Sequence, residues 1–191
     1  MVRGTMAYHR PTRRTALRAI GGGLVVGSLA GPASAGGSDE LSHQLNAVRA
    51  ATREYRDVGA ARDDDYVAIS PYVPGMGFHF SDRDPPFGTA RENPPVLVYF
   101  TNGSYDPAPG DPHDQSRDDD LVLGAVEYLV GGDQTANPPN VFADEEARRN
   151  LKVTEAEGWH FESAEGFTGL HAWVHRGNPA GVFHPTNPNI D

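Results

Sequence analysis

The feature that most constrains the fold is a run of ten residues, Leu121 to Val130, in which Glu127 is the only charged side chain. Side chains of a β-strand alternate between two faces, so residues two apart share a face. The odd-numbered face carries Leu121, Leu123, Ala125, Glu127 and Leu129. Both faces are apolar apart from Glu127, which predicts a strand in the centre of a sheet.

Glu127 is therefore predicted to lie where little water reaches. A carboxylate in such a place is costly unless it is paired or bound to a cation. The chain has 26 acidic residues, and most of them are expected to be solvated. Glu127 is the acidic residue that most strongly indicates a functional site.

A second strand is predicted from Leu170 to His175 and carries two histidines on one face. Residues four apart on a strand are separated by about 13 Å, so His171 and His175 cannot bind the same ion. We expect His171 to be the interior residue of the two, because His175 is followed at once by Arg176 and a turn.

A third strand is predicted at Gly77 to Phe80, and it contains His79. Glycines on both sides of Met76 allow backbone geometries that other residues avoid, which suits a tight entry into a site. Two histidines and one carboxylate from three strands form a facial ligand set for zinc or iron(II), with coordination positions left open. The sequence thus predicts a divalent-metal site at His79, Glu127 and His171, which either binds a small-molecule ligand or activates water.

Two other interpretations of these three residues stay open at this point. They could form a hydrogen-bonded polar network inside the core, or they could lie far apart. His160, between Trp159 and Phe161, is an alternative fourth ligand. The chain has no Gly-x-Ser-x-Gly elbow, phosphate loop or dinucleotide fingerprint, so a metal-free hydrolase ranks behind a non-catalytic surface or interaction protein.

The fold class expected is α+β, with an N-terminal amphipathic helix packed on a mainly antiparallel sheet or partial barrel. The helix is predicted over residues 39–57, resuming through 60–62, and a short one over 144–150. Its apolar stripe comprises Leu41, Leu45, Val48, Thr52 and Tyr55. The strands are predicted at residues 66–70, 77–80, 96–101, 121–130, 159–161 and 170–175.

Residues 1–35 have the three parts of a twin-arginine export signal. Arg13 and Arg14 lie in a basic region, an uncharged stretch follows from Ala19, and a small-residue cleavage site ends at Ala35. We therefore expect cleavage of this segment and a single domain over residues 36–191. The protein is expected to be extracellular or at the cell surface, without a stable membrane span.

The net charge of the chain limits the kinds of molecule that it is expected to bind. Residues 1–35 hold five arginines and no acid, so the remainder carries 11 basic and 26 acidic residues and a net charge of about −15. Such a chain repels phosphate backbones, so nucleic-acid binding is not expected. Diffuse acidity with a single lysine is typical of proteins from salt-loving archaea. The absence of cysteine leaves His, Asp, Glu and backbone oxygen as metal ligands.

Five segments carry a resemblance: Tyr55 to Val58, Gly75 to His79, Val126 to Tyr128, Leu170 to Val174 and Asn178 to Phe183. On these segments, the chain from about Tyr55 to Asn189 resembles a family of exported bacterial and archaeal proteins of uncharacterised activity. That family often has a cysteine near the position of Tyr72 and another beyond that of Ile190, and this chain has neither. The resemblance implies a secreted or surface protein and assigns no catalytic residue.

Overall fold

The computed structural model describes residues 36–101, 115–142 and 158–190, which all belong to one compact unit. The expected export signal and the expected helix at 144–150 lie outside these residues. No helix in the described part of the chain is long and apolar enough to cross a membrane.

The N-terminal helical part consists of three short pieces instead of one helix over 39–57. They are α1 (Gly36–Ala51), the 3-10 helix η1 (Arg53–Arg56) and α2 (Val58–Asp63). Thr52 closes α1, because its hydroxyl donates to the carbonyl of Val48 at 2.8 Å. Asp57 starts α2 by accepting the backbone N–H of Gly59 at 2.9 Å.

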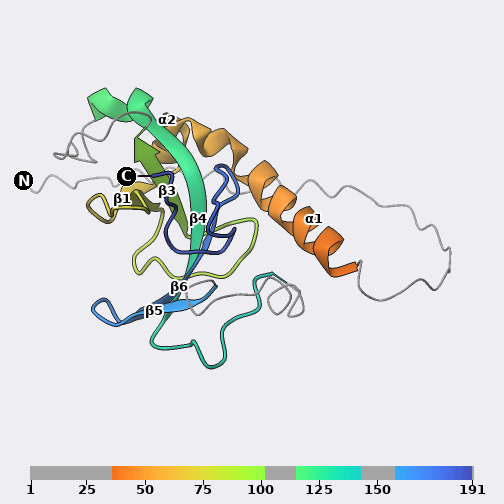
Figure 1. Cartoon of the computed structure of the whole chain (residues 1–191). Coiled ribbons are helices and arrows are strands. Elements are labelled where there is room, and N and C mark those ends of the chain that lie inside the picture. Colours follow the sequence, from red (N-terminus) through yellow and green to blue (C-terminus); the bar gives the residue numbers. More distant parts are fainter. Residues whose placement is uncertain (1–35, 102–114, 143–157, 191) are drawn as a thin grey trace, which may run out of the picture. The chain divides into compact units, whose positions relative to one another are not determined.

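Six antiparallel strands form one open sheet in the order β1-β2-β3-β4-β6-β5. Their bounds are β1 (Val67–Ala68), β2 (Phe78–Ser81), β3 (Val96–Thr101), β4 (Leu121–Gly131), β5 (His160–Glu162) and β6 (Phe167–Ala172). A 3-10 helix, η2 (Gln115–Asp120), precedes β4. Short helices and an antiparallel sheet confirm the α+β prediction (Figure 1).

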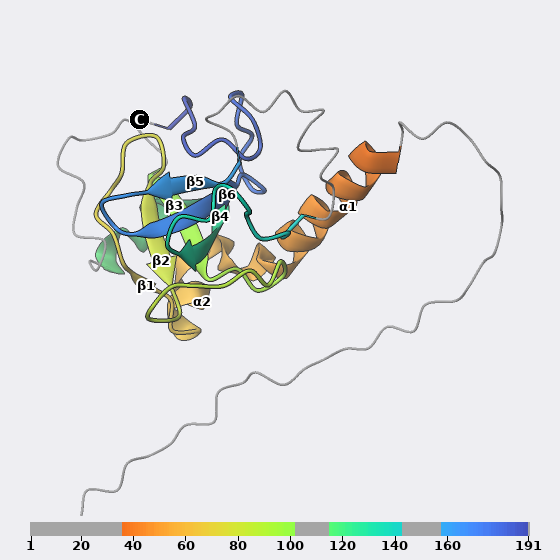
Figure 2. The ribbon, with the colours of Figure 1, turned by 90° about the horizontal axis from the view of Figure 1, so that it is seen from below.

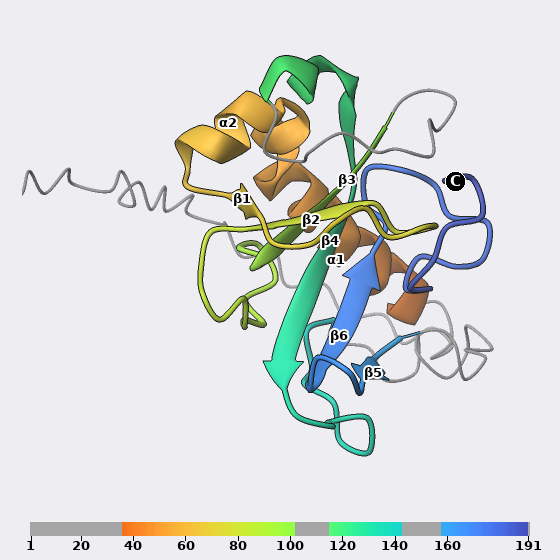
Figure 3. The same cartoon turned by 90° about the vertical axis from the view of Figure 1, so that its left-hand side faces the viewer.

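The long strand β4 lies in the interior of the sheet, and β1 and β5 lie at its two edges (Figure 2). The sheet twists strongly, since β1 and β2 run across the view of Figure 3 while β4 and β6 run along it. The rings of His79 in β2 and His171 in β6 lie 5.7 Å apart between centroids, although β3 and β4 separate these strands in the sheet.

The two faces of the sheet have different roles. One face packs against the helical part: the hydroxyl of Tyr99 donates to the carbonyl of Tyr55 at 2.6 Å, and the guanidinium of Arg62 lies over the ring of Phe80. Strand pairing places His79, Glu127 and His171 on the other face, because paired residues of neighbouring strands share a face.

A β-bulge at Gly124 divides β4 into two stretches with opposite alternation. The pairing with β3 shifts here: consecutive residues of β3 face Ala125 and Leu123, which leaves Gly124 as the extra residue. The prediction that all odd-numbered residues share the face of Glu127 is therefore wrong for Leu121 and Leu123. It holds from Ala125 onward.

The last strand begins and ends earlier than predicted. β6 ends at Ala172 instead of continuing to His175, because the backbone N–H groups of His175 and Arg176 both donate to the carbonyl of Gly124 at 3.0 Å. The imidazole of His175 lies against the helical part and contacts the Thr52 hydroxyl at 2.8 Å. The chain therefore leaves the face that carries His171 before it reaches His175.

Candidate metal centre

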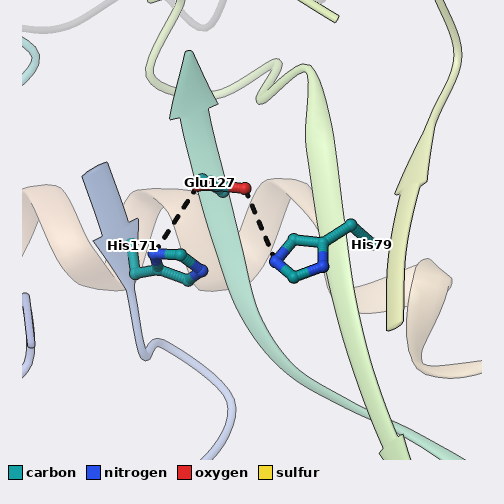
Figure 4. A group of neighbouring side chains, drawn as sticks. All are labelled: His79, Glu127 and His171. Carbon is teal, nitrogen blue, oxygen red and sulfur yellow. Dashed lines mark ion pairs between the residues drawn. The ribbon is translucent and has the colours of Figure 1, made fainter. Parts of the chain in front are cut away.

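Three strands place His79, Glu127 and His171 on one face of the sheet. His171 in β6 is the direct cross-strand partner of Glu127 in β4. His79 in β2 lies across β3, where it pairs with Val98, which in turn pairs with Ala125. The side chains of His79 and His171 therefore approach the carboxylate of Glu127 from opposite sides (Figure 4).

The distances between these side chains suit an ion better than hydrogen bonds. His79 Nε2 lies 3.7 Å from Glu127 Oε2, and His171 Nδ1 lies 3.6 Å from Glu127 Oε1. One ligand atom from each residue lies within 4.8 Å of the other two. Hydrogen bonds of this kind are about 2.7–3.2 Å long, whereas two ligands of a tetrahedral zinc ion lie roughly 3.4 Å apart.

All three side chains are buried, with 8%, 4% and 1% of the surface of His79, Glu127 and His171 exposed. Burial, with a contribution from Glu162, raises the pKa of Glu127 to about 8. Burial, with His160 nearby, lowers the pKa of His79 to about 4, and burial also lowers the pKa of His171. Without a cation the site therefore favours the uncharged form of every group.

His171 is held by ring stacking and not by hydrogen bonds. Its ring stacks on that of His160 at 5.5 Å between centroids and on that of Trp173 at 6.3 Å. The indole N–H of Trp173 donates to the carbonyl of His184 at 2.7 Å, which anchors one side of the stack. Neither ring nitrogen of His171 has a hydrogen-bond partner among the described residues.

Ser70 determines which nitrogen of His79 faces Glu127. The Ser70 hydroxyl donates to the carbonyl of Pro71 at 2.8 Å and lies 2.9 Å from His79 Nδ1. Because its one proton goes to Pro71, Ser70 accepts from Nδ1–H, and Nε2 keeps its lone pair. That tautomer is the one a metal ligand needs, with the second nitrogen fixed by a neighbouring hydrogen bond.

Two glycines give the site its space. A Cβ on Gly169 would lie 2.7 Å from Glu127 Oε1, so the carboxylate occupies the volume that any other side chain would take. Gly77 has a φ of 110°, and a Cβ there would lie 2.2 Å from the carbonyl oxygen of Tyr99. The expectation of special backbone geometry before His79 is confirmed.

A cavity of about 270 Å³ opens on the three residues. His160 lines it but does not join the group, because its Nε2 lies 3.2 Å from Glu162 Oε1 and its ring covers His171. The apolar walls of the cavity are formed by Ile69, Val73, Met76, Pro86, Leu129 and Phe167. An ion held at the group would therefore face a space that admits a small ligand.

The structure brings together all three residues selected from the sequence as a group able to hold a metal ion. The interpretation that they lie far apart is wrong. Sequence reasoning missed Ser70 and Gly169, whose roles depend on non-local contacts, although a lone glycine within a predicted strand is a signal of close approach.

Searches against protein-family models, curated proteins and solved structures find no match for the chain.

Proposed function

We propose that this chain is an exported protein that binds one divalent metal ion, zinc or iron(II), through His79, Glu127 and His171. The ion has open coordination positions toward the cavity, where it holds water or a small ligand. The resemblance of Gly75 to His79 and of Leu170 to Val174 to motifs of an exported family supports export and assigns no metal ligand.

The observation that carries the proposal is the state of His171. Its side chain is 1% exposed, and neither nitrogen has a hydrogen-bond partner among the described residues. Buried polar atoms are almost always satisfied, since an unsatisfied one costs about 1–3 kcal/mol. A hydrogen-bonded network would remove that cost, but the Glu127 oxygens are too distant to form it. A metal ion bound to one ring nitrogen of His171 removes the cost at that nitrogen.

The ligand types favour zinc or iron(II). Two imidazole nitrogens and one carboxylate form a set used by catalytic zinc sites and non-haem iron sites, which keep at least one position for water or substrate. A metal there would supply a Lewis acid and lower the pKa of a bound water. Ser70 would hold His79 in the correct tautomer, and the apolar walls would limit access of bulk water.

The test is the metal content of the full chain, purified without an affinity tag and measured by elemental mass spectrometry. We expect about one zinc or iron per chain in the wild type and loss of at least nine-tenths of it in His79→Ala and in His171→Ala. His43→Ala is the matched control, because His43 is exposed on α1, and it should keep the full metal content.

A wild-type protein that stays metal-free after incubation with each ion, and whose melting temperature does not change with chelators, would instead indicate a structural polar core.

Export is tested separately. Arg13→Lys with Arg14→Lys should retain the protein inside the cell, and mass spectrometry of the secreted protein should place its N-terminus after Ala35.

A further inference from the structure

A second hollow lies beside the metal cavity, and we call it the edge groove. Its volume is about 670 Å³, and it runs along β1 and the loop after β2. The edge groove and the metal cavity have four lining residues in common: Ile69, Pro86, Glu165 and Phe167. The two hollows are therefore neighbouring parts of one depression that leads from the sheet edge to the metal centre.

The floor of the edge groove is apolar and exposed. Val67, Ile69 and Phe87 are 53%, 45% and 40% exposed, and all three line the groove. Val67 pairs with Ser81, and the N–H of Ile69 donates to the carbonyl of His79, so their side chains lie on the face of the metal centre. Exposed apolar side chains gathered in one hollow indicate a binding surface.

The backbone beside this floor belongs to an edge strand of the sheet. β1 is the last strand on its side of the sheet, and within the described ranges no segment pairs with its outer side. Because Ile69 bonds to β2 and neighbouring residues alternate, Ala68 directs its N–H and C=O outward. An extended peptide can add to such an edge and place alternate side chains in adjoining pockets.

Charge selects the kind of peptide. Four carboxylates and one guanidinium are among the described residues that line the groove: Asp65, Asp82, Asp84, Glu165 and Arg83. The guanidinium of Arg83 is occupied by Asp82, at 2.6 Å and 3.2 Å. The exposed carboxylates of Asp65, Asp84 and Glu165 therefore favour a ligand with positive charges.

We propose that the edge groove binds an extended peptide with apolar and basic side chains, which adds to β1 as an antiparallel strand and reaches toward the metal centre. Binding depends on β1, the apolar floor and the acidic rim. Only the contact of the bound peptide with a metal ion rests on the proposed function.

The test is fluorescence anisotropy of a labelled ten-residue peptide of alternating lysine and valine, titrated with the full chain at 0.15 M salt. A peptide of alternating glutamate and valine and a lysine–valine peptide methylated on alternate backbone nitrogens are the comparison ligands. We expect the first peptide to bind at least tenfold more tightly than either of these.

Val67→Lys should weaken binding of the basic peptide at least tenfold, because Val67 is 53% exposed and lines the edge groove but not the metal cavity. Its matched control is Phe161→Lys, because Phe161 is 38% exposed on the opposite edge strand β5 and the substitution makes the same change in net charge. Equal weakening by both variants would show general attraction to an acidic protein and overturn the proposal. Equal binding of the methylated peptide would overturn strand addition.

Metal content measured on the same samples separates this inference from the proposed function. Val67→Lys should keep its metal while it loses peptide binding. Peptide binding by a metal-free wild type would leave the groove assignment standing and refute the metal centre. A metal-loaded wild type that binds none of the three peptides would do the reverse.

Discussion

Gly169 shows how much the site depends on one missing methyl group. Because a Cβ would lie 2.7 Å from Glu127 Oε1, Gly169→Ala should displace the carboxylate. We expect the metal affinity to fall about 10–100-fold, as for other residues that position ligands, measured by competition with a chromophoric chelator. Gly177→Ala is the control, because a Cβ there meets no atom within 4 Å. An unchanged affinity in Gly169→Ala would contradict the role assigned to Gly169.

His171→Leu separates a metal ligand from a structural residue. Leucine has a similar volume and no polar atom, so the metal-free variant should be more stable than the metal-free wild type by about 1–3 kcal/mol. Urea unfolding in the presence of a chelator measures this difference. His175→Leu is the comparison and should destabilise, since His175 contacts the Thr52 hydroxyl. A less stable His171→Leu would indicate that His171 has a structural partner.

At the scale of elements, His175 connects the segment after β6 to the helical part. Its Nε2 lies 2.8 Å from the Thr52 hydroxyl, and the side chain of Arg56 donates to its Nδ1 at 3.3 Å. Burial, with Arg56 and Arg49 nearby, lowers the pKa of His175 to about 4. The folded protein therefore keeps this imidazole neutral in mildly acidic solution.

Stability should consequently fall as the pH drops from about 6.5 to about 4. In this window the unfolded chain binds a proton at His175 that the folded chain does not, so protonation favours unfolding. His175→Gln should reduce the pH dependence of the free energy of unfolding, measured by urea titration at several pH values. His43→Gln should leave it unchanged, because His43 is exposed. A parallel pH profile for His175→Gln would contradict the assignment.

The strands also show where prediction from local sequence patterns fails. The positions of β2, β3 and β4 follow from runs of apolar and aromatic residues, and the predicted burial of Glu127 is confirmed. The predicted alternation of β4 is wrong before Gly124, because a bulge depends on what packs there. A Cβ on Gly124 would lie 3.0 Å from the ring of Phe100 and 3.2 Å from that of Trp173, contacts that no local window reveals.

At the scale of the whole molecule, the acidic charge should make stability depend on salt. The chain carries a net charge of −10, and self-repulsion weakens as salt shortens the screening length from about 10 Å at 0.1 M to about 3 Å at 1 M. Raising KCl over this range should raise the melting temperature by roughly 5 °C. For a domain of this size, a change of 1 kcal/mol in the free energy of unfolding shifts the melting temperature by about 2–4 °C. Calorimetry measures the shift, with sucrose as the uncharged control. An equal effect of both solutes would show that charge is not the cause.

The sequence by itself determined the α+β class, the interior position of β4 and the isolation of Glu127 in apolar surroundings. These properties depend on side-chain periodicity, which is local. It also limited the metal ligands to oxygen and imidazole, because the chain contains no cysteine.

Only the tertiary structure decided that His79 and His171 meet Glu127 and that Gly169 leaves room for its carboxylate. It also placed the exposed floor of Val67, Ile69 and Phe87 beside the metal cavity. These relations depend on strand order, register and twist. Strand order, register and twist are decided by packing between segments far apart in the chain. Residues 79, 127 and 171 therefore become neighbours only when the whole sheet has formed.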